Sequence, residues 1–143
     1  MKTVREVLEK KGGDVWTIDP GVTVREALTQ MAEKDVGALV VTKEGSVIGV
    51  ISERDYARKV IMKGKSSLET LVEDIMVRDP RCVTPAETIG ECMATMTEKR
   101  IRHLPVLEGI SLVGLVSIGD VVKSIISAHE SKIDELESYI YGK

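Results

Sequence analysis

The stretch Val47-Ile48-Gly49-Val50-Ile51-Ser52-Glu53-Arg54-Asp55 is matched in character by Leu112-Val113-Gly114-Leu115-Val116-Ser117-Ile118-Gly119-Asp120. Each is a short apolar run that contains one glycine and ends in Ser-x-x-Asp. Short apolar runs bounded by polar residues are typical of buried strands, and a serine after such a run is a typical helix start. Each half of the chain therefore predicts a strand that leads into a helix, with an aspartate one turn inside it.

The repetition extends well beyond these two stretches. Residues 14–61 align with residues 79–126 without a gap, at an offset of 65 residues. Solenoid units have roughly 20–50 residues, and two copies cannot make an array. We therefore expect two small α/β units that bury their sheets against each other, so that any site should occur twice. Identical aligned pairs include Pro20 and Pro85, Met31 and Met96, Leu39 and Leu104, and Asp55 and Asp120.

The composition limits the class of protein. The chain has 143 residues, of which 43% are hydrophobic, with no Phe, one Trp and three Tyr. A core built from Val, Ile, Leu, Met and Ala suits a buried sheet covered by helices. Each half is small for a unit that is stable alone, so we expect the two halves to form one module.

Charge and hydropathy exclude several classes of function. The net charge of −3 gives no reason to expect nucleic-acid binding, and an anionic ligand would need a local positive site. The N-terminus has no signal-peptide pattern, and no apolar run approaches the ~18–20 residues of a membrane span. We therefore expect a cytoplasmic protein with no membrane partner. Cys82, Cys92, His103 and His129 lack the spacing of metal ligands, so no metal site is expected.

The helices and turns can be predicted from local patterns. Thr23-Val24-Arg25-Glu26 and Thr88-Ile89-Gly90-Glu91 have the form of capping boxes at helix starts. A short amphipathic helix at residues 4–8 resembles residues 72–76, but at an offset of 68 residues. The three extra residues lie around Lys11-Gly12-Gly13, which is a turn signal. Extended stretches are expected at 15–18 and 81–84, hairpins at 37–51 and 104–116, and second helices at 53–62 and from 118 onward.

These patterns divide the chain into a first repeat at 1–64, a second repeat at 65–128 and a helical extension at 129–143. The apolar residues of the extension continue at helical spacing from the second repeat. They form a seam of about two heptads, which is too short to be a coiled coil by itself. We expect it to dock on the second repeat or on a partner subunit. The seam consists of Ile126, His129, Ile133, Leu136 and Ile140.

The Ser-x-x-Asp phrase has two interpretations. A helix N-terminus favours phosphate, a serine can donate to it, and a short carboxylate can accept hydrogen bonds from both hydroxyls of a ribose. The alternative is a capping box, whose partner is normally Glu or Gln because these side chains reach back. The first helices use Glu26 and Glu91, whereas both second helices use the shorter Asp. This difference favours a binding role, but leaves capping open.

The order of motifs resembles the CBS domain, named for cystathionine β-synthase. The resemblance covers residues 4–126 and rests on the strand–helix–hairpin–helix order, the proline before each first helix and the repeated Ser-x-x-Asp phrase. Two such domains in tandem resemble a CBS pair, or Bateman module. Residues 51–60 and 100–106 look especially like stand-alone CBS pairs of bacteria and mitochondria. The implied fold is α/β, with two β-α-β-β-α repeats related by a pseudo-two-fold axis.

The resemblance implies a ligand and its contacts. CBS pairs bind AMP, ADP, ATP, NAD(H) or S-adenosylmethionine between their repeats. Asp55 and Asp120 would hold ribose, and Ser52 and Ser117 would lie near ribose or phosphate. Thr17, Ile18, Cys82 and Val83 would line the adenine pocket. Arg102 and His103 would contact phosphate, while Gly37 and Ala38 take their places in the first repeat, and Pro105 aligns with Val40.

The two repeats are unequal in charge. Lys99, Arg100, Arg102 and His103 belong to the second repeat. We therefore expect unequal sites, with phosphates near Arg102 and His103, and an Asp55 site that relies on Arg54 or on charge from across the cleft. The alternative is that these residues form a solvated basic loop.

We expect a regulatory protein that binds an adenine nucleotide, forms a homodimer and signals to a separate, unidentified partner. The ligand would be regulatory, and no catalytic cofactor is expected. One alternative is a dimerisation or interaction scaffold with an empty cleft. Another is an enzyme that acts on a nucleotide; against it, no Ser, Cys or Lys is framed by a recognisable base and orienting group.

Overall fold

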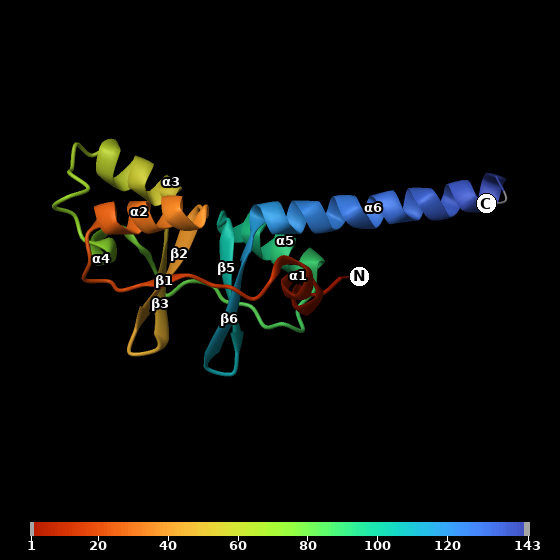
Figure 1. Ribbon diagram of the computed structural model, residues 1–143, viewed down its shortest axis with the longest axis horizontal. Coiled ribbons are helices and arrows are strands. Elements are labelled where there is room, and N and C mark those ends of the chain that lie inside the picture. The colour runs from red at the N-terminus through yellow and green to blue at the C-terminus, as the bar shows by residue number, and fades with distance from the viewer. Residues whose placement is uncertain (1, 142–143) are drawn as a thin grey trace.

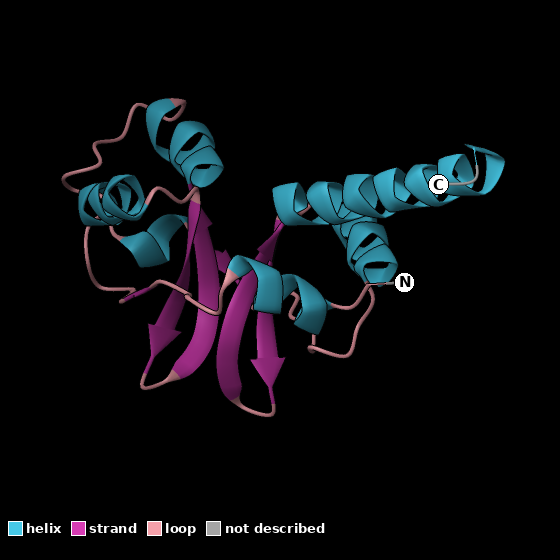
Figure 2. Cartoon of the chain, turned by 45° about the vertical axis from the view of Figure 1, so that its right-hand side comes forward, coloured by secondary structure: helices cyan, strands magenta, loops and turns pink. Residues whose placement is uncertain are grey.

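The hairpin and the helices before and after it occur in the same order in both halves of the chain, as the repeat predicts. The computed structural model describes residues 2–141. Figure 1 shows the elements in chain order, and Figure 2 shows the two hairpins side by side at the centre. The predicted α/β class is confirmed.

The first half contains α1 (Val4–Lys11), β1 (Thr17–Ile18), α2 (Val24–Lys34), β2 (Ala38–Lys43), β3 (Ser46–Ser52), α3 (Glu53–Tyr56) and a π-helical segment (Ala57–Ile61). The second contains α4 (Val72–Ile75), β4 (Val77–Arg78), α5 (Ile89–Lys99), β5 (His103–Glu108), β6 (Ser111–Ser117) and α6 (Ile118–Tyr141).

The hairpins form the centre of each repeat. β2 pairs antiparallel with β3, and β5 pairs antiparallel with β6. β1 adds to β2 in parallel and β4 adds to β3 antiparallel, which gives a four-stranded sheet in the order β1-β2-β3-β4. The extended stretch expected at 81–84 is reduced to a single parallel bridge between Val83 and Val106. The second sheet is accordingly assigned only the two strands of its hairpin.

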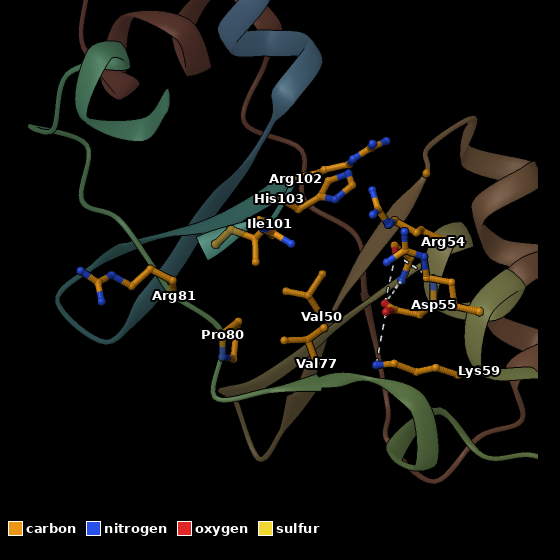
Figure 3. A pocket seen from close by; sticks show the side chains of 14 residues that line it. Val50, Arg54, Asp55, Lys59, Val77, Pro80, Arg81, Ile101, Arg102 and His103 are labelled. Atoms are coloured by element: carbon orange, nitrogen blue, oxygen red, sulfur yellow. Dashed lines mark hydrogen bonds and ion pairs between the residues drawn. The ribbon is translucent and has the colours of Figure 1, made fainter. Parts of the chain in front are cut away.

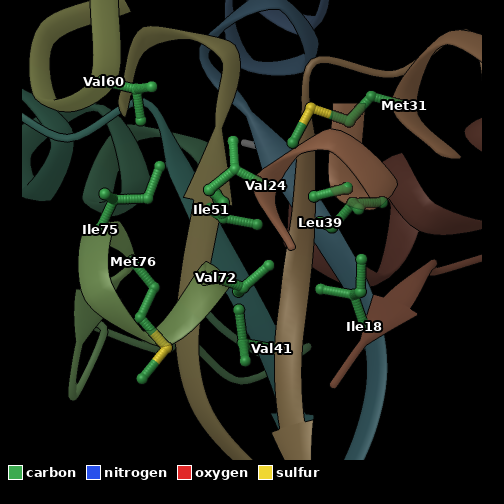
Figure 4. Packing of buried hydrophobic residues seen from close by; sticks show 11 residues of the cluster. Ile18, Val24, Met31, Leu39, Val41, Ile51, Val60, Val72, Ile75 and Met76 are labelled. Atoms are coloured by element: carbon green, nitrogen blue, oxygen red, sulfur yellow. The ribbon is translucent and has the colours of Figure 1, made fainter. Parts of the chain in front are cut away.

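The first helix of each repeat begins where the sequence predicts. The hydroxyl oxygens of Thr23 and Thr88 accept hydrogen bonds from the N–H groups three residues later, at 3.2 and 3.1 Å. The apolar faces of α2 and α5 then pack on the sheets. Figure 4 shows the first core, in which Val24 and Met31 of α2 lie over Leu39 and Ile51.

Packing of the short helices crosses the boundary between the repeats. α1 begins the first repeat, yet Val4 and Val7 are buried in the core of the second. α4 begins the second repeat, yet Val72 and Ile75 are buried in the core of the first. Each repeat thus completes its core with the short helix that begins the other repeat. The division of the chain at residues 64 and 128 stays a prediction. A division along the sequence cannot show that α1 and α4 each pack in the core of the other repeat.

Helix α6 extends far beyond the second repeat (Figure 1). Val121 in its first turn is fully buried, whereas Ile126, Ile133, Leu136 and Ile140 are 51–70% exposed. The chain therefore leaves the predicted apolar seam uncovered. Within residues 2–141, no helix is both long and apolar enough to cross a membrane.

Candidate functional site

A cavity of about 400 Å³ lies between the two repeats (Figure 3). Each half of the chain contributes seven of the lining residues. The first half provides Gly37, Val50, Ser52, Arg54, Asp55, Arg58 and Lys59, and the second provides Val77, Pro80, Arg81, Arg100, Ile101, Arg102 and His103. The cavity therefore combines the first Ser-x-x-Asp phrase with the basic segment of the second repeat.

The pairing of strands places these groups. Ala38 at the start of β2 pairs with Ser52 at the end of β3, and the N–H of Glu53 donates to the carbonyl of Gly37 at 3.1 Å. In the second repeat, His103 pairs with Ser117, and the N–H of Ile118 donates to the carbonyl of Arg102 at 2.8 Å. Each Ser-x-x-Asp phrase is thus fixed beside the residues that open its hairpin.

Asp55 forms the full capping box that the sequence left open as an alternative to a binding role. Its Oδ2 accepts from the backbone N–H of Ser52 at 2.9 Å and from the Ser52 hydroxyl at 3.0 Å. The N–H of Asp55 donates to Ser52 Oγ at 3.2 Å. The shorter side chain of aspartate is therefore no evidence against capping, and the binding role of Asp55 stays a prediction. The extended backbone of Ser52 brings its N–H within reach of the carboxylate.

The same contacts change the expected role of the helix N-termini. The N–H groups of Glu53 and Asp55 are already hydrogen-bonded to Gly37 and Ser52, so they are not free for phosphate. Asp55 Oδ1, in contrast, has only a 3.4 Å contact with Lys59 Nζ. Two of the N–H groups at this helix start are thus occupied, so anion binding would depend largely on side chains. Asp55 Oδ1 lies beside Lys59 in the cavity wall.

The cavity is strongly basic, although the chain carries a net charge of −3. Its lining residues include one carboxylate, that of Asp55, and six side chains of permanent positive charge: Arg54, Arg58, Lys59, Arg81, Arg100 and Arg102. Removal from water lowers the pKa of Arg54, and repulsion by Arg58 and Arg102 lowers it further. Such crowding of like charges favours a bound polyanion.

His103 lies where the two repeats meet. Burial lowers its pKa, and the ammonium group of Lys11 acts in the same direction, while Asp120 and Asp55 oppose them. The imidazole is therefore mainly neutral at neutral pH. Both Asp55 and Asp120 act electrostatically on the imidazole, so His103 lies between the two Ser-x-x-Asp phrases.

The second phrase has a different environment. Asp120 Oδ2 accepts from the N–H of Ser117 at 2.8 Å, as in the first repeat, but also from Lys11 Nζ at 2.6 Å. Lys11 Nζ also donates to the carbonyl of Leu115 at 2.8 Å. Burial acts to raise the pKa of Asp120, but the bonds from Lys11 and Ser117 outweigh it and lower the pKa. A second cavity, of about 620 Å³, lies between α1 and α6 and is bounded by Lys11 and Asp120.

The structure brings together part of the predicted site. Gly37, Ser52, Arg54, Asp55, Arg102 and His103 line the cavity between the repeats, and Asp120 lines the second cavity. Ser117 caps α6 beside Asp120. The remaining predicted residues line neither cavity: Ile18, Ala38, Val83 and Pro105 are buried, Thr17 is exposed, and Cys82 contacts the Pro80 carbonyl.

Seven cations that line the two cavities were not predicted: Arg58, Lys59 and Arg81 in the first, and Lys2, Lys10, Lys11 and Lys123 in the second. Arg58 and Lys59 follow Asp55 by three and four residues, and this helical spacing could have placed them beside it. Arg81 precedes Cys82 in the stretch already assigned to the adenine pocket. No sequence pattern indicated that Lys11 would contact Asp120, because the two residues are 109 positions apart. The segment around Lys11 showed only the turn at Gly12 and Gly13. Among residues 2–141, no group of three or more His, Cys, Asp or Glu is placed to hold a metal ion.

Comparisons with known proteins match both halves of the chain. The CBS domain family model matches residues 4–61 and 72–127. The mitochondrial CBS domain-containing protein CBSX3 of Arabidopsis thaliana is 40% identical, over 98% of this chain and 72% of that protein. A solved protein with CBS domains from Burkholderia ambifaria has a TM-score of 0.84 at 46% identity, covering 88% of this chain and 95% of that one. The CBS pair of MJ0100, in complex with 5′-methylthioadenosine and S-adenosylmethionine, shares the fold at 20% identity, with a TM-score of 0.79 over 90% of this chain and 98% of that one.

Proposed function

Because this chain belongs to the CBS domain family and carries two CBS domains in tandem, we propose that it is a regulatory protein that binds an adenine nucleotide between its repeats. CBS-pair proteins are generally regulatory, and some bind adenosine ligands. The observation that carries the proposal is the cavity of about 400 Å³ that joins Asp55 to a cluster of basic side chains.

The cavity offers a partner for each part of a nucleotide. Asp55 is fixed by its bonds to Ser52, and its Oδ1 is left to accept hydrogen bonds from ribose hydroxyls. Val50, Val77 and Ile101 form an apolar wall against which a base can pack (Figure 3). The arginines at the other end are suited to phosphate, because the guanidinium group binds phosphate oxygens in pairs.

The charge of the cavity favours one class of adenosine ligand. Six cations and one carboxylate give it a strongly positive potential. S-Adenosylmethionine carries a positive sulfonium, and 5′-methylthioadenosine carries no phosphate. We therefore expect ADP and ATP to bind more tightly than AMP, and every phosphate-bearing ligand, NAD(H) included, to bind more tightly than S-adenosylmethionine.

The ligand would act as a signal, not as a substrate, and the proposal assigns no catalysis to this chain. Binding shifts a conformational equilibrium only if the affinity differs between two states. The cavity lies between the repeats, so a bound nucleotide would favour one relative position of the two. We propose that a homodimer transmits this change to a separate protein. A cytoplasmic location stays a prediction, since the name of one relative places that protein in mitochondria.

Calorimetric titration with AMP, ADP, ATP, NADH and S-adenosylmethionine tests the proposal. We expect micromolar binding of at least one phosphate-bearing ligand, about −8 kcal/mol, and loss of that binding in Asp55→Ala. Asp14→Ala is the matched control, because Asp14 is exposed and does not line the cavity.

The second candidate is a ligand-free scaffold, which the exposed seam of α6 favours. Flat titrations with all five ligands would support it, provided that mass spectrometry of the purified protein finds no nucleotide already bound. If Asp55→Ala instead bound the nucleotide with full affinity, the nucleotide would bind somewhere other than this cavity.

A further inference from the structure

Five arginines line the cavity between the repeats, and none of their guanidinium groups is paired with another residue within residues 2–141. The arginine side chains that do have partners there are Arg5, with Glu108, and Arg78, with the carbonyl of Glu73. We propose that the unpaired arginines make the cavity a site for linear inorganic polyphosphate, which binds without a nucleoside. The five are Arg54 and Arg58 of the first repeat and Arg81, Arg100 and Arg102 of the second.

The ligand class goes beyond the proposed function, because polyphosphate has neither base nor ribose. Its binding does not depend on that function. Only the competition between polyphosphate and a nucleotide, which would use the same arginines, rests on the proposed function.

The charges of these arginines act on one another across the boundary between the repeats. Removal from water lowers the pKa of Arg54, repulsion by Arg58 and Arg102 lowers it further, and the opposing effect of Asp55 is smaller. Figure 3 shows Arg54 and Arg102 approaching the same region from the two repeats. A multivalent anion between them would replace this repulsion with attraction to both.

Polyphosphate suits such a set of arginines better than a small anion does. A guanidinium group binds phosphate oxygens in pairs and stays charged at neutral pH. Tripolyphosphate carries three linked phosphate groups and can contact several arginines at once, whereas sulfate offers a single group. All five arginines are exposed, so an anion can reach them from solvent. We therefore expect the affinity to rise from phosphate through pyrophosphate to tripolyphosphate.

The nucleoside end of the cavity is not needed for this binding. Asp55 is bound to Ser52 and lies 3.4 Å from Lys59, and its charge repels an anion. The apolar side chains of Val77 and Ile101 offer phosphate no hydrogen bond. Polyphosphate would therefore use the arginines and gain nothing from Asp55, which a nucleotide would use for its ribose.

The second cavity is less suited to a polyanion, although four lysines line it. Three carboxylates lie among them, and Lys11 is paired with Asp120 at 2.6 Å. The first cavity has six cations and one carboxylate, so its potential is the more positive of the two. The charged residues of the second cavity are Lys2, Glu6, Glu9, Lys10, Lys11, Asp120 and Lys123.

Titration calorimetry with sodium tripolyphosphate, without divalent cations and at constant ionic strength, tests the inference. We expect one equivalent per chain, and binding about tenfold weaker or more in Arg54→Gln and in Arg102→Gln, because each variant loses hydrogen bonds between charged groups. Arg25→Gln removes the same charge from an exposed position on α2, and Lys10→Gln removes a charge from the second cavity. Both controls should bind tripolyphosphate like the wild-type protein. Thermal unfolding of each variant shows whether it is folded.

Asp55→Asn distinguishes polyphosphate from a nucleotide at the same site. This variant should bind tripolyphosphate at least as tightly as the wild-type protein does, because a repelling charge is removed. It should bind ATP more weakly, because the carboxylate that would hold the ribose is lost. Saturating tripolyphosphate should abolish the heat of ATP binding to the wild-type protein.

The outcomes separate the inference from the proposed function. ATP binding without tripolyphosphate binding, or ATP binding that saturating tripolyphosphate leaves unchanged, would overturn the inference and leave the proposed function intact. Tripolyphosphate binding that requires Arg54 and Arg102, with no binding of any nucleotide, would do the reverse. Sulfate that binds as tightly as tripolyphosphate, or an equal loss of affinity in Arg25→Gln or Lys10→Gln, would show general attraction of anions and overturn the inference. No binding of either ligand would overturn both.

Discussion

Arg102 and Asp55 line one cavity from opposite repeats, so the second repeat supplies positive charge to the cavity that contains Asp55. We predict that Arg102→Ala weakens ATP binding about tenfold or more, because a hydrogen bond to a charged group contributes about 1.5–3 kcal/mol. The affinity for adenosine, which carries no phosphate, should change little in Arg102→Ala. Arg25→Ala removes the same charge from an exposed position on α2 and is the control. Equal losses for ATP and adenosine would show that Arg102 acts through the fold.

His103 gives the ligand-free protein a pH dependence. Burial lowers its pKa below the ordinary value of 6.5, with Lys11 acting in the same direction. The unfolded chain therefore takes up this proton at a higher pH than the folded chain. The contribution of His103 to the free energy of unfolding is fully present above pH 6.5 and is lost as the pH falls below it.

We predict that the melting temperature of the wild-type protein falls more between pH 7 and about pH 5.5 than that of His103→Gln. Above pH 7, the difference between the melting temperatures of the two proteins should be constant. Saturating ATP should reduce the difference, because phosphate beside a protonated imidazole favours the charged form. Parallel pH profiles for the two proteins would exclude His103 as the titrating group.

The short helices dock on glycines of the central strands. A Cβ at Gly114 would meet Leu8 Cδ2 at 2.7 Å, and one at Gly49 would meet Met76 Sδ at 2.6 Å and the Val77 carbonyl oxygen at 2.9 Å. We predict that both glycine-to-alanine variants lower the free energy of unfolding by about 1–3 kcal/mol. Gly49→Ala should cost more, because the Val77 backbone cannot rotate aside as a side chain can. Urea unfolding measures both.

Gly13→Ala is the control for these variants, since its Cβ would meet no atom closer than 4.0 Å. Gly49→Ala should also weaken nucleotide binding, because Val77 lines the cavity. Gly114→Ala should instead disturb α1 and Lys11. If the two variants were no less stable than Gly13→Ala, the helices would not be held by this close approach.

Local sequence patterns predicted most helices and strands, but they did not predict contacts between residues far apart in the sequence. Alternating apolar runs and turn residues placed both hairpins, and the threonine caps placed α2 and α5, because these signals act within a few residues. The exchange of α1 and α4 between cores depends on packing over distances that periodicity does not encode. In the site, Asp55 and Arg102 followed from the repeat and the family resemblance. Lys11 did not, because only the folded chain brings it to Asp120.

At the scale of the whole molecule, the exposed seam of α6 is a surface through which the proposed homodimer could form. Ile126, Ile133 and Ile140 recur every seven residues, with His129 and Leu136 at the two intervening positions. Isoleucine at the first position of the heptad and leucine at the fourth favour parallel two-stranded coiled coils. In that arrangement Lys132 of one chain lies opposite Glu137 of the other, which adds a complementary charge pair on each side.

We predict that Leu136→Asp raises the dissociation constant of the homodimer at least tenfold, which sedimentation equilibrium measures directly. Placing a charge in an apolar interface is costly, whereas Ser131→Asp adds the same charge on the outer face and should leave the dimer unchanged. Lys132→Glu should weaken the dimer, and Lys132→Glu/Glu137→Lys should restore it, because the pair is only inverted. Two heptads are too few to dimerise alone, so the bodies of the two chains must also be in contact. If Leu136→Asp and Ser131→Asp dissociate alike, those bodies form the dimer without α6, and its seam is left for another protein.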